Sequence, residues 1–395
     1  MPIVLRLAIF YASICLFMGI YLPYFPVWLT DKGFGPRDIA LVLSGAMFLR
    51  IAVSPLLAFL ADHWQDRRRL VLYLAWTAWA VVTLYIWADG FWPILLVSLL
   101  LMSLTPSIMP VAEAITVQAV KDNQIDYGRV RLWCSLAFMG ASFAGGWLLT
   151  SRPPSVILVC MIAGIGVMVM GSHLLPTNVK PLRRKRVRGG QMAGAFQVAR
   201  HPVFLLFLAA SSLNQASHAV YYGFGTLNWQ RLGYEESVIG LLWAVGVVAE
   251  IVLFAFSRPV IGRLGAVGLL ILGAAGGVAR WTLTAFSPPL ATLFFVQILH
   301  ALSFGATHLG AVLFVAQAAP SSLSTTAQSI YSAFAVGAMM GLAMLASGVL
   351  YAQSGASAYL VMAAMSAVSL GLALWLRARW DGAPLVEEFE ESEAA

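Results

Sequence analysis

The amino-acid sequence predicts an all-α membrane protein in which twelve transmembrane helices form two pseudo-symmetric bundles of six. Three observations support this prediction. Of the 395 residues, 60% are hydrophobic and only 10% are charged, whereas about a quarter of the residues in soluble domains are charged. The apolar runs are about 20 residues long, which is enough to cross a bilayer as a helix, and membrane-barrel strands are about half that length. The two halves of the chain also resemble each other.

The predicted helices follow one another with short connections. They cover residues 7-29, 39-61, 70-88, 93-119, 130-150, 156-176, 203-229, 238-257, 266-286, 289-317, 326-351 and 357-376. The first run is longer than the core of a signal peptide and lacks a small-residue cleavage site, so we expect it to be retained as a span.

The longest connection is rich in arginine and divides the helices six and six. We therefore predict an N-terminal bundle at 1-176, a cytoplasmic basic linker at 177-202, a C-terminal bundle at 203-376 and an acidic cytoplasmic tail at 377-395. The tail ends EEFEESEAA without an apolar period, and we expect it to be disordered from Asp381 onwards.

The two halves match at a constant spacing along the chain. The aligned pairs are Gly33 with Gly233, Phe34 with Tyr234, Ile39 with Ile239, Leu41 with Leu241, Tyr21 with Tyr221, and Arg50 with Glu250. Weak symmetry between two six-helix halves is typical of secondary transporters, which bind their substrate between the halves. The pattern therefore favours a transporter.

Lys and Arg residues concentrate in the loops on the side of the N-terminus, which predicts that both termini are cytoplasmic. We expect a multi-pass protein of a bacterial-type inner (plasma) membrane. The net charge of +7 follows from this loop bias, and it gives no reason to expect nucleic acid as a partner. The expected partners are a small-molecule substrate, protons and the lipid bilayer, and we expect a monomer.

The three cysteines, Cys15, Cys134 and Cys160, all lie within predicted spans and lack the spacing of a metal site. We therefore expect neither a disulfide framework nor a bound metal, and no cofactor. No nucleophile and base pattern indicates an enzyme.

Ionisable residues inside predicted spans are costly and indicate function. Asn214, His218, Tyr221 and Tyr222 fall on one face of a helix, at i, i+4, i+7 and i+8. Glu250 interrupts an otherwise uncharged run. Arg50 keeps its charge at physiological pH, so it needs either a carboxylate in the bundle or an anionic substrate.

The loop after the second span, ADHWQDRRR, resembles the loop signature of the major facilitator superfamily. Asp62, Arg67 and Arg68 match the signature, whereas other positions depart from it. These residues form either a conformational latch between helices or a set of charges that fixes topology.

Several longer motifs carry a closer resemblance over residues 5 to 375. SHAVYYGF, NWQRLGY, LLWAVGVVAEI, DYGRVRLW and LHALSFGATH are similar to the 3-phenylpropionate permease family of that superfamily, and more distantly to lactose permease. The resemblance implies the major facilitator fold and proton-linked uptake of a small substrate.

The resemblance to lactose permease also implies roles for single residues. Glu113 and Arg131 match its substrate-binding pair, and Phe138 falls at its sugar-stacking aromatic. Arg280 and His300 match residues of its proton-coupling half. The carboxylate expected three residues after His300 is Ser303 in this chain.

The proton must therefore be carried elsewhere, and the candidates are Glu250, His300, His308 and His218. Without the resemblance, Glu113 has the alternative role of a structural ion-pair partner, and Arg131 that of an anchor at the membrane surface.

An aromatic carboxylate as substrate would explain buried arginines, aromatic side chains and protonatable groups together. Arg280 or Arg131 would hold its anionic end, and Tyr221, Tyr222 and Arg50 would contribute to the site. The alternatives are a proton-linked symporter of sugars or nucleosides, a drug exporter, or a membrane receptor that transports nothing.

Overall fold

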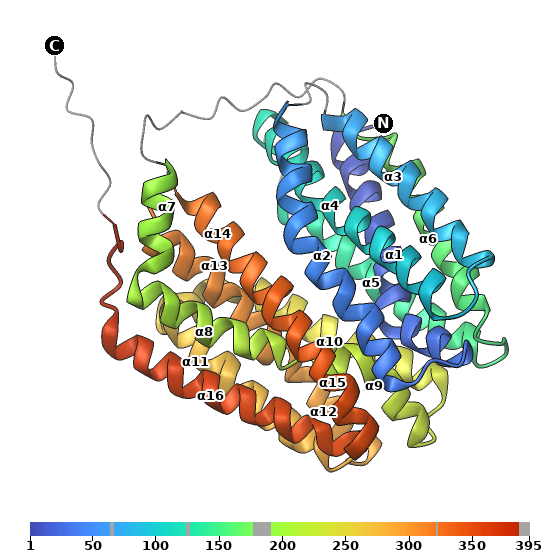
Figure 1. The fold of residues 1–395 in the computed structure, drawn as a ribbon. Coiled ribbons are helices and arrows are strands. Elements are labelled where there is room, and N and C mark those ends of the chain that lie inside the picture. The colour runs from blue at the N-terminus through green and yellow to red at the C-terminus, as the bar shows by residue number, and fades with distance from the viewer. Residues whose placement is uncertain (64–66, 124–126, 177–190, 321–322, 387–395) are drawn as a thin grey trace.

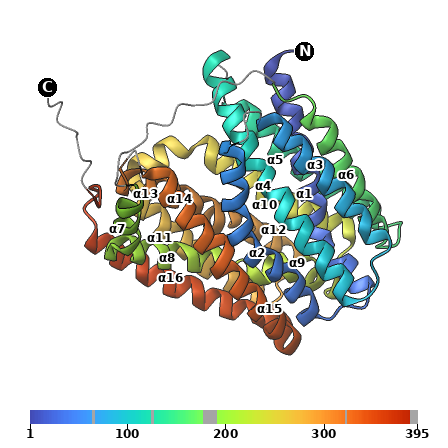
Figure 2. The ribbon, with the colours of Figure 1, turned by 45° about the horizontal axis from the view of Figure 1, so that its top comes forward.

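The computed structural model describes residues 1–63, 67–123, 127–176, 191–320 and 323–386. Helices are the only regular elements of these residues. The first half contains α1 (Ile3–Asp31), α2 (Pro36–His63), α3 (Arg67–Thr83), the 3-10 turn η1 (Leu84–Ile86), α4 (Phe91–Asn123), α5 (Tyr127–Leu149) and α6 (Val156–Ser172). Figures 1 and 2 show these helices as one group, beside a second group that begins at α7.

The second group carries more interruptions than the first. Its members are α7 (Gln191–Arg200), α8 (Pro202–Ala216), α9 (Ala219–Arg231), α10 (Glu236–Ala255), α11 (Ser257–Ala285), α12 (Leu290–Ile298), η2 (Ala301–Ala306), α13 (Thr307–Ala318), α14 (Ser324–Ser332), η3 (Ala333–Met339), α15 (Met340–Ser354), η4 (Gly355–Ala358) and α16 (Tyr359–Arg379). The elements η2 and η3 are π-helical, and π-helical turns within α-helices occur frequently at functional sites.

The predicted spans coincide with these helices to within a few residues, except that α11 begins earlier, with a helical segment before Gly265 that the sequence placed in a loop. Within the described residues, nine stretches are long and apolar enough to cross a membrane. The last of them, Thr326–Arg379, includes two helices that turn at Gly355. The all-α prediction is confirmed, and the number of twelve crossings stays a prediction.

The internal repeat is visible in the backbone where α1 and α9 end. Gly33 and Gly233 adopt φ angles of 84° and 83°, in the left-handed region that favours glycine. The amide of Gly33 donates to Thr30 O at 2.9 Å, and the amide of Gly233 donates to Gln230 O at the same distance. Phe34 and Tyr234 follow with equivalent bonds. We call the end of the molecule that carries these two turns the turn end.

The two halves meet closely near the turn end. The Tyr24 hydroxyl of α1 donates to Ser142 O of α5 at 2.5 Å. A Cβ atom at Gly240 of α10 would lie 2.6 Å from Ser142 O and 2.9 Å from the Tyr24 hydroxyl. Gly146 of α5 likewise leaves no room for a side chain, because the Glu236 carbonyl fills that space. Only glycine permits this approach of α5 and α10.

The structure corrects the expectation for the cysteines. Cys15 of α1 and Cys134 of α5 form a disulfide, with their Cα atoms 5.1 Å apart, and Cys160 is free. This pair could not be predicted because 119 residues separate its members, and only the packing of α1 on α5 brings them together.

The tail also differs from its prediction in the residues that are described. The amide of Leu385 donates to Ala318 O at 2.8 Å, and Val386 is buried. Residues 381 to 386 therefore pack against the C-terminal half, because the apolar pair Leu385 and Val386 interrupts the polar sequence. Residues 387–395 and most of the predicted basic linker lie outside the described residues, and the part of the linker at Gln191–Arg200 is helix α7. The domain boundaries stay a prediction.

Candidate functional site

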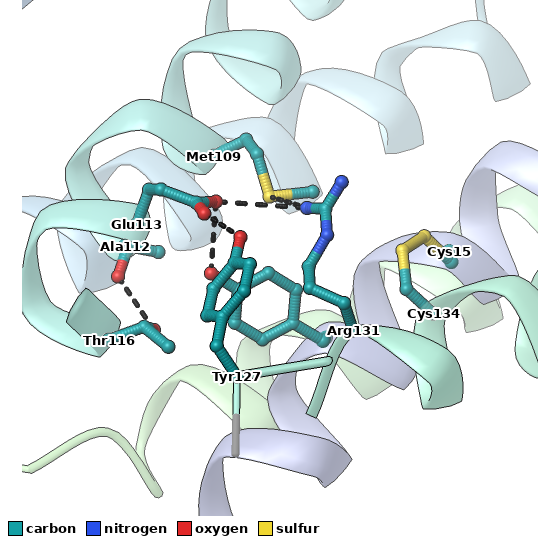
Figure 3. A network of polar contacts seen from close by, with 9 residues as sticks. Cys15, Met109, Ala112, Glu113, Thr116, Tyr127, Arg131 and Cys134 are labelled. Atoms are coloured by element: carbon teal, nitrogen blue, oxygen red, sulfur yellow. Dashed lines mark hydrogen bonds and ion pairs between the residues drawn. A yellow bond between two sulfur atoms is a disulfide. The ribbon is translucent and has the colours of Figure 1, made fainter. Parts of the chain in front are cut away.

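The N-terminal half places a carboxylate among polar partners, as Figure 3 shows for Glu113, Tyr127 and Arg131. Arg131 Nη1 of α5 lies 3.7 Å from Glu113 Oε2 of α4, and both side chains are partly exposed. The hydroxyls of Tyr11 and Tyr127 donate to the two oxygens of Glu113, the former at 3.1 Å. The pairing of Glu113 with Arg131 fits both the binding and the structural interpretation, but their exposure leaves the pair accessible to a ligand.

The C-terminal half buries a cation completely. Arg280 of α11 has no exposed surface. It interacts with Nδ1 of His300 at 2.8 Å, the Ser303 hydroxyl at 3.1 Å and the Gln297 carbonyl at 3.1 Å. Its guanidinium carbon also lies 4.6 Å from the ring centre of Tyr221 and 4.5 Å from that of Trp281. Within the described residues, no carboxylate is within ion-pair distance of Arg280.

The hydrogen-bond partners fix the proton positions of this cluster. Nδ1 of His218 faces two backbone carbonyls, those of Asn214 and Gln215, at 3.2 Å each, so it carries the proton. In the neutral ring Nε2 of His218 is an acceptor, and it lies 3.1 Å from the Ser303 hydroxyl, which can donate to it. The same hydroxyl oxygen accepts from Arg280. His218 is therefore satisfied as a neutral ring.

His300 is constrained in the same way from two sides. Arg280 can only donate, so Nδ1 of His300 accepts and its proton is on Nε2. That nitrogen lies 3.6 Å from Glu250 Oε2 of α10. A second proton on His300 would place a donor against the Arg280 donor. The geometry therefore leaves His300 with one ring proton, on Nε2, which faces the Glu250 carboxylate.

A row of stacked rings runs from His300 along the π-helical turn η2 into α13. Phe304 stacks on His300 with ring centres 5.2 Å apart, and His308 stacks on Phe304 at 5.9 Å. His308 is exposed, whereas His300 is 8% exposed. The stack therefore leads from the buried cluster to an exposed side chain.

The remaining candidates are more dispersed. Tyr221 donates to Gln297 Oε1 at 3.1 Å, and Tyr222 stacks on His218. Arg50 lies on α2, on the same helical face as Leu43, which contacts α9 at Gly223. Among the described residues Arg50 has no hydrogen-bond or ion-pair partner.

Phe138 lies two turns after Arg131 on α5 and packs, partly buried, against a hydrophobic core to which both halves contribute. Arg68 donates to His173 O at 2.7 Å, which joins α3 to α6 within one half, and Arg67 has a partner of its own. The Asp62 side chain is outside the described residues. The latch therefore stays a prediction.

Three residues of the clusters were missed as candidates. Gln297 is a lone amide in an apolar span, three residues before His300, and this position was a usable signal. Tyr11 lies in a run of apolar residues with nothing to distinguish it. Tyr127 was visible beside Arg129 and Arg131, but its bond to Glu113 depends on the packing of α4 against α5. Among the described residues, no group of His, Cys, Asp or Glu could hold a metal ion.

Comparisons with known proteins agree with this architecture. The chain is 34% identical over 365 residues to the "Probable 3-phenylpropionic acid transporter" of Escherichia coli (strain K12), which covers 90% of this chain and 93% of the relative. It is 26% identical over 330 residues to the "Maltose permease" of Geobacillus stearothermophilus, covering 82% of each chain.

Among solved structures, the nucleoside transporter NupG superposes with a TM-score of 0.81 at 16% identity, covering 96% of this chain and 99% of that one. A bacterial homologue of the human lysosomal transporter Spinster superposes with a TM-score of 0.69 at 14% identity, covering 95% and 96%. These relatives and neighbours are transporters and not enzymes, as the sequence predicts. The model of the MFS_1 like family matches residues 4–361, and the chain accordingly belongs to this family of multi-pass membrane transporters.

Proposed function

We propose that this transporter takes up a small aromatic carboxylate, such as 3-phenylpropionate, together with a proton. The observation that carries the proposal is Arg280, a fully buried cation whose hydrogen-bond partners are all neutral. A buried charge needs a counter-ion, and the carboxylate of a bound substrate would supply it. The rings of Tyr221 and Trp281 beside Arg280 suit an aromatic substrate. The 34% identical relative named for 3-phenylpropionic acid supports the same choice.

Glu250 is the proton carrier in this proposal. His218 and His300 are held as neutral rings by their partners, whereas Glu250 has an exposed part and contacts His300 at 3.6 Å. Protonation of Glu250 would remove a negative charge from the approach to Arg280 and so favour binding of an anionic substrate. Release of the proton on the inner side would then favour release of the substrate, by alternating access between the two halves.

The Glu113 and Arg131 pair would form the opposite wall of the site. Glu113 lies 3.7 Å from Arg131 and would hold it in place. A substrate bound between this pair and Arg280 would then link the two halves of the transporter, as a coupled cycle requires.

Neutral substrates are the alternative, because relatives include a maltose permease and the fold matches a nucleoside transporter. Glu113 with its two tyrosines could bind hydroxyl groups. A neutral ligand would leave Arg280 without a counter-ion, so the geometry of the second half favours the anion. A panel of aromatic acids, sugars and nucleosides in competition separates the two.

Uptake of radiolabelled 3-phenylpropionate into proteoliposomes tests the proposal. Accumulation should require an inward proton gradient and should be competed by other aromatic acids but not by maltose or uridine. Uptake that is indifferent to the gradient would refute proton coupling. Binding without flux would indicate a receptor, and competition by the neutral compounds would refute the substrate class.

A further inference from the structure

We infer that Ser303 and Gln297 determine the choice of an anionic over a neutral substrate, because they keep Arg280 without a counter-ion inside the protein. The inference rests on the proposed function, in which Arg280 binds the carboxylate of the substrate. It adds a specific cause, the neutral chemistry of two side chains that touch the guanidinium.

Ser303 occupies the position where a carboxylate would neutralise Arg280. It is fully buried in η2, and its hydroxyl lies 3.1 Å from Arg280 Nη1 and 3.1 Å from His218 Nε2. The hydroxyl accepts from Arg280 and donates to His218, so it satisfies both partners and adds no charge. An aspartate at this position would lie within ion-pair distance of the guanidinium.

Gln297 occupies the second such position. Its Oε1 atom accepts from Arg280 Nη2 and from the Tyr221 hydroxyl, both at 3.1 Å, and its side chain is 1% exposed. A glutamate has the same shape as glutamine and would keep both acceptor contacts. It would bring a negative charge against Arg280 and replace the amide NH2 group by a second oxygen.

One feature of Arg280 indicates that the charge is reserved for a ligand. Its Nε atom is buried and has no hydrogen-bond partner in the described structure. A carboxylate that accepts from Nε and a terminal nitrogen together is the usual two-point partner of a guanidinium. Ser303 and Gln297 occupy the terminal nitrogens with neutral oxygens and leave the charge uncompensated.

The experiment compares binding of 3-phenylpropionate and its neutral amide, 3-phenylpropanamide, to the purified full-length protein. The variants are Ser303→Asp and Gln297→Glu, and Ser303→Asn is the control because it matches aspartate in size without the charge. We expect the wild type and Ser303→Asn to prefer the acid. In the two acidic variants the affinity for the acid should fall roughly 100-fold or more, as expected when a buried charge pair is lost, while the affinity for the amide changes only a few-fold.

The outcomes separate this inference from the function it rests on. A wild type that binds neither the acid nor the amide refutes the proposed substrate class. A wild type that prefers the acid, with Ser303→Asp and Gln297→Glu behaving like Ser303→Asn, leaves the substrate class in place and refutes the role of the two residues. Equal loss of both ligands in Ser303→Asp and Ser303→Asn shows an effect of size, and Gln297→Glu, which conserves size, then decides the question alone.

Discussion

At the scale of single residues, the sequence identified the ionisable groups inside the spans but could not rank them. Four residues were candidates for carrying the proton, namely His218, Glu250, His300 and His308. Their positions in the sequence do not show which of them can change its protonation state. Hydrogen-bond partners distinguish two of the four, because Nδ1 of His218 faces carbonyls and carries a proton, whereas Nδ1 of His300 faces Arg280 and does not. Such assignments need the hydrogen-bond partners of each nitrogen, and the spacing of the residues along the chain does not reveal them.

Glu250→Gln should abolish accumulation of substrate against a gradient while exchange of substrate across the membrane continues. The glutamine keeps the size of the side chain and a contact with His300, but it cannot carry a proton. The measurement is uptake driven by an imposed pH gradient, compared with counterflow at equal pH on both sides.

The matched control for this variant is Glu235→Gln, at an exposed position just before α10. It makes the same chemical change and should leave both activities as in the wild type. Normal accumulation by Glu250→Gln would remove Glu250 from the coupling.

At the scale of helices, the length of the apolar runs and the composition of the loops were sufficient to predict the spans. A helix that crosses a bilayer needs about 20 apolar residues whatever it packs against. The interruptions were not predictable. The break between α8 and α9 at Ser217 and His218 and the π-helical turn at His300 occur where side chains bond to neighbouring helices. Local sequence does not contain those contacts.

Gly240→Leu should open the turn end. The leucine side chain would collide with Ser142 O and the Tyr24 hydroxyl, so α5 and α10 must separate. Spin labels attached at Asp89→Cys and Glu235→Cys, one in each half, should move apart in this variant in a Cys160→Ser background. Electron-spin resonance measures the distance between the labels.

Gly140→Leu is the control on α5, because nothing lies within 4 Å of a Cβ atom built at Gly140. It should leave the distance between the labels unchanged. An unchanged distance in Gly240→Leu as well would show that the close approach does not hold the halves together.

At the scale of the whole molecule, the repeat was readable in the sequence as pairs such as Gly33 and Gly233, and the structure shows the same turn at both places. The repeat does not extend to the chemistry of the halves. In the first half Arg131 is partly exposed beside the Glu113 carboxylate, and in the second half Arg280 is buried among neutral groups. This difference between the halves depends on what each helix packs against, and an alignment of the two half-sequences does not reveal it.

The disulfide between Cys15 and Cys134 has a practical consequence for thiol chemistry. Cys160 is the one cysteine left free, so alkylation of the denatured, unreduced protein should add one label per chain. The same treatment after a reductant should add three, and intact-mass spectrometry counts the labels. Three labels before reduction would contradict the pairing. A single native thiol means that Cys160→Ser alone provides a background free of reactive sulfur, in which probes can report on each half of the transporter separately.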